Sequence, residues 1–137
     1  MIRRRRLGRL LTTLCCTALA CSSQDLESRT SAARVARAIE VLRAAPNPSK
    51  AGVLADLVKL RCLGVDVCET RDVCSDAYRV HVDAVALTQA AKLQISDGKA
   101  PEAAKLLVSA EEKLSEAGRR VARCAEREAS LRHRYKL

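Results

Sequence analysis

The residues best suited to chemistry in this chain are four cysteines and one histidine in its second half. They are Cys62, Cys68, Cys74, Cys124 and His81. Thiolate and imidazole groups bind Zn²⁺, and a helix would place His81 near Cys74, so Cys62, Cys68, Cys74 and His81 form one candidate metal site. The five residues between successive cysteines are more than zinc sites favour. The alternative chemistry for these cysteines is a pair of disulfides.

No arrangement of residues typical of an enzyme is visible. The two histidines, His81 and His133, have no catalytic motif around them, and the chain has no Cys-x-x-Cys redox motif. The acidic residues Asp72, Asp76 and Asp83 have the spacing of a solvated helix face. We therefore expect no enzymatic activity, no cofactor and no small-molecule substrate.

The first twenty residues have the pattern of an export signal. Four consecutive arginines, Arg3 to Arg6, precede a short apolar stretch from Leu7 to Ala20. This stretch is too short to cross a bilayer as a permanent helix. A basic start, a short apolar region and an exit of small residues are typical of a secretory signal. We expect removal of residues 1–20, which leaves residues 21–137 as a single mature domain.

The end of this segment, Ala18-Leu19-Ala20-Cys21, resembles the lipobox of bacterial lipoproteins. The resemblance covers about residues 1–23 and implies that the Cys21 thiol is acylated. It departs from the usual pattern, which has leucine three residues before the cysteine and a small residue two before it. Ser22-Ser23 is similar to a lipoprotein tether, and no aspartate follows Cys21, which implies the outer membrane of a Gram-negative cell. Ordinary cleavage before Cys21 is the alternative.

The cysteine count favours lipidation. The chain has seven cysteines, and removal of residues 1–20 takes Cys15 and Cys16 away. If Cys21 carries a lipid, four cysteines remain, an even number that suits two disulfides in an oxidising compartment. We therefore expect a domain that faces the periplasm or the cell surface.

The mature chain has the composition and periodicity of an all-α protein. Alanine is abundant and there are only five glycines and three prolines. Apolar residues at helical spacing predict one helix from about Ser22 to Pro46 and a second that has Ser49 as its N-cap and ends at Gly64. We expect a loop at 63–69 that holds Cys68. Two long helices follow, at about 70–97 and 101–134, so the prediction is a small bundle of about four helices.

The two long helices are predicted to form an antiparallel hairpin. Alanine recurs every seventh residue at 77, 84 and 91 and again at 103, 110 and 117, with Cys124 one heptad later. Small residues at this spacing let antiparallel helices approach closely. With the turn near 98–99, residues that face each other have numbers that sum to about 197. We therefore predict a Cys74–Cys124 disulfide, which leaves Cys62–Cys68 as the second.

Positive charge is concentrated at the end of the chain. The formal net charge is +9, but Arg3 to Arg6 and Arg9 lie in the predicted signal. The absence of Phe and Trp argues against nucleic acid as a partner. A functional interpretation of the basic end is contact with anionic envelope surfaces, and the alternative is that it complements the helix dipole and aids solubility. The residues concerned are Arg119, Arg120, Arg123, Arg127, Arg132, Arg134 and Lys136.

These observations predict a non-enzymatic, exported lipoprotein that binds a partner or has a structural role at the cell envelope. Its expected partners are the membrane, through the N-terminal lipid, and an unidentified envelope protein. One alternative is a periplasmic metal-binding protein or small enzyme that uses Cys62, Cys68, Cys74 and His81. The other is a binder of anionic envelope surfaces through the basic C-terminal helix.

Overall fold

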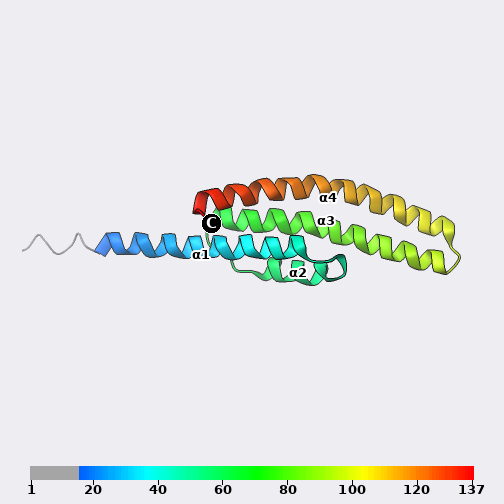
Figure 1. Cartoon of the computed structure of the whole chain (residues 1–137), viewed down its shortest axis with the longest axis horizontal. Coiled ribbons are helices and arrows are strands. Elements are labelled where there is room, and N and C mark those ends of the chain that lie inside the picture. Colours follow the sequence, from blue (N-terminus) through cyan, green and yellow to red (C-terminus); the bar gives the residue numbers. More distant parts are fainter. Residues whose placement is uncertain (1–15) are drawn as a thin grey trace, which may run out of the picture.

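Four helices make up the described part of the chain, as Figure 1 shows. The computed structural model describes residues 16–137, with side chains from residue 24 onward, so the Cys21 thiol and residues 1–15 of the predicted signal lie outside it. The helices are α1 (Cys16–Ala44), α2 (Asn47–Lys59), α3 (Val65–Ser96) and α4 (Ala100–Tyr135). The described residues contain no strand, which confirms the predicted all-α fold.

The long helices α3 and α4 run antiparallel and pack along the predicted row of alanines. Ala77, Ala84 and Ala91 are fully buried on α3, and the α4 alanines at 103, 110 and 117 are also buried. A three-residue link joins the helices, and its Gly98 has a φ of 74° that favours glycine. The hairpin is therefore the predicted one, and its register follows from the alanine spacing.

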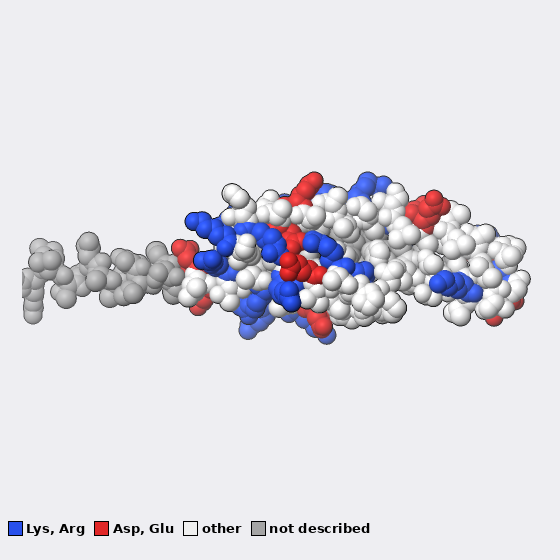
Figure 2. All heavy atoms as spheres, viewed as in Figure 1, with Lys and Arg blue, Asp and Glu red and all other residues white. Residues whose placement is uncertain are grey.

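Half of this hairpin extends beyond the other two helices. Figure 1 shows that α1 and α2 lie beside one end of α3 and α4, while the end that contains the turn projects alone. We call residues 83–116 the distal hairpin. Figure 2 shows that Lys, Arg, Asp and Glu gather over the end where the helices pack, while the viewed face of the distal hairpin is mostly uncharged. None of the described helices combines the length and apolar character needed to cross a membrane.

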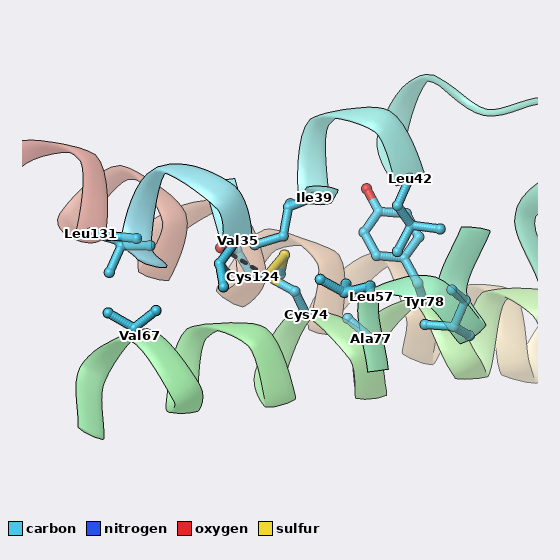
Figure 3. Close-up of a cluster of buried hydrophobic side chains, with 12 residues drawn as sticks. Val35, Ile39, Leu42, Leu57, Val67, Cys74, Ala77, Tyr78, Cys124 and Leu131 are labelled. Carbon is cyan, nitrogen blue, oxygen red and sulfur yellow. Dashed lines mark hydrogen bonds between the residues drawn. A yellow bond between two sulfur atoms is a disulfide. The ribbon is translucent and has the colours of Figure 1, made fainter. Parts of the chain in front are cut away.

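The hydrophobic core lies where α1 and α2 meet the hairpin (Figure 3). The apolar stripe predicted on α1 is buried here, with Val35, Ile39 and Leu42 fully enclosed. Leu57 of α2 and Tyr78 of α3 complete the centre of this cluster. Because these side chains come from elements far apart in sequence, their burial holds α1 and α2 against the hairpin.

The second helix starts three residues earlier than predicted. Its N-cap residue is Pro46, and Pro48 lies in the first turn, where a missing backbone N–H is tolerated. Ser49 is therefore not the cap: its hydroxyl donates to the Pro46 carbonyl at 3.0 Å. The helix ends at Lys59, because Leu60 is extended, and not at Gly64.

The third helix also starts earlier, at Val65 and not near residue 70. Gly64 precedes this helix with a φ of 94°, a conformation that favours glycine, so it turns the chain into α3 and does not end α2. Cys68 consequently lies in the first turn of α3, where its N–H donates to the Gly64 carbonyl. The actual loop is 60–64, and it holds Cys62.

The alanine row can be tested with a matched pair of substitutions. Ala84→Leu places three extra carbons at a fully buried position between α3 and α4, so we expect the free energy of unfolding to fall by about 1–3 kcal/mol. Ala86→Leu makes the same change at an exposed site of the same helix, where an effect within about 0.5 kcal/mol is expected. Urea denaturation followed by circular dichroism measures both. Equal losses in the two variants would contradict close packing at Ala84.

Candidate functional site

The predicted pairs of cysteines form the two disulfides of the structure. Cys74 and Cys124 join the first third of α3 to α4 with a Cα–Cα distance of 4.8 Å, and both are buried in the core (Figure 3). This bridge spans 50 residues of sequence, and closing such a loop in the unfolded chain is worth roughly 4 kcal/mol in the chain-entropy estimate. Its effect is to hold the hairpin closed beside α1.

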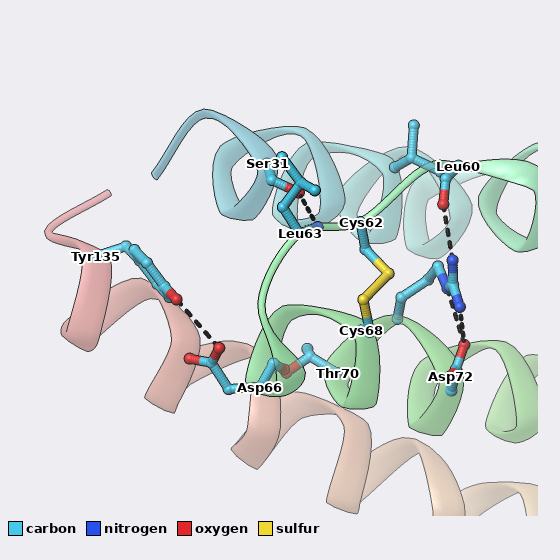
Figure 4. Close-up of a disulfide and its surroundings, with 10 residues drawn as sticks. Ser31, Leu60, Cys62, Leu63, Asp66, Cys68, Thr70, Asp72 and Tyr135 are labelled. Atoms are coloured by element: carbon cyan, nitrogen blue, oxygen red, sulfur yellow. Dashed lines mark hydrogen bonds and ion pairs between the residues drawn. A yellow bond between two sulfur atoms is a disulfide. The ribbon is translucent and has the colours of Figure 1, made fainter. Parts of the chain in front are cut away.

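The Cys62–Cys68 disulfide lies at the loop between α2 and α3 (Figure 4). Two hydrogen bonds hold the same loop in place. The Leu63 N–H donates to the Ser31 hydroxyl of α1 at 2.9 Å, and Arg71 donates to the Leu60 carbonyl, also at 2.9 Å. The bridge is therefore part of a rigid connection between α1, the loop and α3.

The alternative metal site is not assembled in this structure. All three of its cysteines are in disulfides, and thiolates are the form that binds metal. The ring of His81 instead lies 3.1 Å from the Asn47 side-chain oxygen. Burial, with the charge of Lys50, lowers the pKa of His81. Within residues 24–137, no three His, Cys, Asp or Glu side chains are placed to hold a metal ion.

The most enclosed charge of the domain is the Glu128 carboxylate, whose side chain is only 5% exposed. It accepts hydrogen bonds from Arg43 of α1 and, at 3.0 Å, from Arg132 of its own helix. Arg132 also donates to Glu40 of α1 at 2.7 Å. The bond to Glu128 raises the pKa of Arg43. Together these four side chains form an ionic cluster that joins α4 to α1.

A second buried charged residue, Lys50, was not identified from the sequence. Its ammonium donates to the Leu42 and Arg43 carbonyls at 3.0 and 3.1 Å, so it caps the C-terminal end of α1. It also lies 5.7 Å from the centre of the Tyr78 ring, within reach of a cation–π contact. Burial lowers the pKa of Lys50. Nothing in the local sequence distinguishes it from a surface lysine, because its partners come from another helix.

Four of the seven basic C-terminal residues form ion pairs. Arg132 lies inside the ionic cluster, while Arg127 and Arg134 pair with Glu69 and Asp66 of α3 at 3.4 and 2.9 Å. Arg120 pairs with Glu116. The other three, Arg119, Arg123 and Lys136, have no ion pair among residues 24–137. Ion pairing therefore reduces the positive charge that this end of the chain presents, and contact of its exposed residues with anionic surfaces stays a prediction.

One groove of about 660 Å³ runs between α3 and α4. It is lined by Val73, Asp76, Arg120, Arg123, Glu126, Arg127, Ser130 and Arg134. Its walls carry both signs of charge, since the acidic Asp76 comes from α3 and the four arginines from α4. A cavity that offers both carboxylates and guanidinium groups suits ion pairs with another protein surface better than a purely anionic ligand.

The distal hairpin displays most of the large apolar side chains that remain on the surface of the two long helices. They are Leu93, Ile95, Leu107, Val108 and Leu114, of which Leu93 is 66% exposed. They lie on both helices, and α1 and α2 do not reach this end of the hairpin (Figure 1). Exposed apolar side chains on a projecting element are available for contact with another protein.

No protein-family model, curated protein or solved structure matches this chain.

The ionic cluster makes a specific prediction about stability. Glu128→Gln keeps the shape of the side chain but removes the charge that binds Arg43 and Arg132, so we expect the free energy of unfolding to fall by about 1–3 kcal/mol. Glu126→Gln is the control, because Glu126 is exposed on the same helix and should change stability by less than about 0.5 kcal/mol. Chemical denaturation of both variants at neutral pH makes the comparison. A Glu128→Gln variant as stable as the parent would show that the cluster contributes nothing.

Proposed function

We propose that this protein is an exported lipoprotein, held to the bacterial envelope by acylation of Cys21, that acts by binding a partner protein. In this proposal residues 1–20 are removed, and the domain faces the periplasm or the cell surface from the outer membrane. The domain has no catalytic role. Its helices serve to hold a contact surface at a fixed distance from the membrane.

The observation that carries this proposal is the separation between the two ends of the molecule. The backbone of Cys21 lies near the start of α1, and the turn of the hairpin lies at the opposite end of the molecule (Figure 1). A lipid on Cys21 would therefore direct the distal hairpin away from the membrane. Helix α1 alone, from residue 21 to Ala44, would account for about 36 Å of this separation.

The surface at that far end favours a protein as the partner. Exposed side chains such as Leu93, Leu107 and Leu114 project from the outside of two helices, and small molecules usually bind in concave sites. Apolar side chains with scattered charges are common in protein interfaces. The disulfide between Cys74 and Cys124 supports this role, since it fixes the base from which the distal hairpin projects.

Intact mass spectrometry of the native protein from membranes tests the anchor. We expect a chain that begins at Cys21, carries the added mass of acyl groups, and lacks four hydrogens because of two disulfides. The Cys21→Ser variant should lose both the acyl mass and the association with membranes. A native chain that begins at Cys21 without added mass would show ordinary secretion and refute the lipid anchor.

Site-specific photo-crosslinking in intact cells tests the contact surface. A crosslinking amino acid at Leu107 or Leu114 should give the same discrete adduct, because both positions lie on the distal hairpin. The controls are Asp56 and Lys59, which are exposed on α2 and should not give that adduct. Equal adducts at all four positions, or none at Leu107 and Leu114, would contradict a partner at the distal hairpin.

A further inference from the structure

Charged residues form two matched rows along the hairpin. On α3, Glu69, Asp76 and Asp83 recur every seventh residue; on α4, Lys113, Arg120 and Arg127 do the same. We call these the acidic row and the basic row. All six side chains are between about one-third and just over one-half exposed, so both rows are available to another surface.

The hairpin register sets the two rows level with each other. Arg127 bridges to Glu69 at 3.4 Å, and Lys113 bridges to Asp83 at 3.8 Å. These outer pairs show that each acidic residue lies opposite a basic one. Both distances are long for an ion pair, and exposed pairs of this kind contribute little to stability. Their carboxylates therefore keep the capacity to accept further hydrogen bonds.

The middle residues of the two rows, Asp76 and Arg120, do not pair with each other. Asp76 and Arg120 both line the groove between α3 and α4, yet each binds a neighbour on its own helix instead. Asp76 pairs with Arg79 at 2.6 Å, and Arg120 pairs with Glu116. Arg123 lines the same groove and has no ion pair among residues 24–137. The groove therefore offers an acid on one wall and guanidinium groups on the other.

The face that carries the rows is not used by the rest of the domain. Contacts of α1 and α2 with the hairpin go through residues such as Tyr78, His81, Glu128 and Arg132. The side-chain ion pairs of the row residues lie only on α3 and α4 within the described chain. Between the rows lie half-buried Val73, Val80 and Leu87. This face has an apolar centre and charged edges, as protein interfaces do.

We propose that this face binds a second copy of the same chain, with the two copies parallel. A two-fold axis parallel to the helices places α3 of one copy on α4 of the other. Rotation about this axis does not shift residues along the helices, so each residue stays at the same level. Every acidic row then meets a basic row, and the interface is self-complementary, as two-fold dimers require. The antiparallel alternative places α3 on α3 and α4 on α4, which brings like charges together and costs binding energy.

Charge and size both favour a second copy over other occupants. A polyanion would approach Arg120 and Arg123 but would also meet Asp76 and Glu126 in the same groove. The 32 residues of α3 span about 48 Å, and two helix widths give a face of roughly 900 Å², close to the roughly 800 Å² per partner of a standard interface. The parallel arrangement also leaves both N-terminal ends on the same side, which is compatible with two lipid anchors but does not depend on them.

Substitutions that reverse the charge of one residue in each row test this proposal. The test uses residues 21–137 with Cys21→Ser, which keep every buried residue and both disulfides, and measures mass by sedimentation equilibrium. The parent should be a dimer at micromolar concentrations. Asp76→Lys and Arg120→Glu should each raise the dissociation constant by about tenfold or more. Mixed together, these two variants should form a heterodimer, because the introduced lysine of one chain then faces the introduced glutamate of the other.

The controls separate this interface from general charge effects. Arg119→Glu makes the same charge change one residue away, at an exposed position outside both rows, and should leave the dissociation constant unchanged. Circular dichroism should show that all variants keep the helical fold. A monomeric parent, or a dimer insensitive to both Asp76→Lys and Arg120→Glu, would refute the proposal. A heterodimer of Asp76→Lys with the parent that is tighter than the parent dimer would refute the parallel arrangement in favour of the antiparallel one, because only α3 on α3 places the introduced lysine against an acidic residue.

Discussion

The close approach of α3 and α4 along their alanines is the constraint on which the rest of the structure depends. Because Ala77, Ala84 and Ala91 have no bulk beyond one methyl group, the helices can pack only in the register that sets these residues against the opposite helix. That register brings Cys74 within bonding distance of Cys124. It also sets the acidic row level with the basic row and presents one continuous surface to α1. A shift of one residue along either helix would misplace all three features.

The hairpin and its disulfide could be predicted because both follow from periodicity within a continuous segment. The alanine spacing and the position of Gly98 fix which residues face each other, and no information from other elements is needed. The ends of α2 and α3 could not be placed in this way. Gly64 is equally suited to ending one helix or preceding the next, and only the contacts of the 60–64 loop with Ser31 and Arg71 decide between them.

The partners of the charged residues were even harder to predict from the sequence than the ends of the helices. Glu128 stands out in the sequence as a polar interruption of an apolar row, but its partner Arg43 is 85 residues away. A buried carboxylate needs hydrogen bonds from such partners, so burial of Glu128 depends on α1 docking where it does. The same docking takes Arg132 into the cluster and leaves about one-third of its side chain exposed. Counting basic residues near the end of the chain therefore overstates the positive surface, because ion pairing between helices is a tertiary property.

The alanines that fix the register also leave the distal hairpin weakly supported. A buried methyl group contributes about 0.8 kcal/mol, against about 1.5–3 kcal/mol for a buried leucine side chain, and α1 and α2 add nothing at this end. A two-helix element with such a thin core gains most of its stability from whatever packs on its outer faces. Leu93, Leu107 and Leu114 are exposed there, although their burial would strengthen the element. The row of alanines that fixes the packing of α3 on α4 thus also accounts for the apolar surface available for binding. Larger residues in this row would bury more apolar area between the two helices, and the distal hairpin would then gain less stability from a partner.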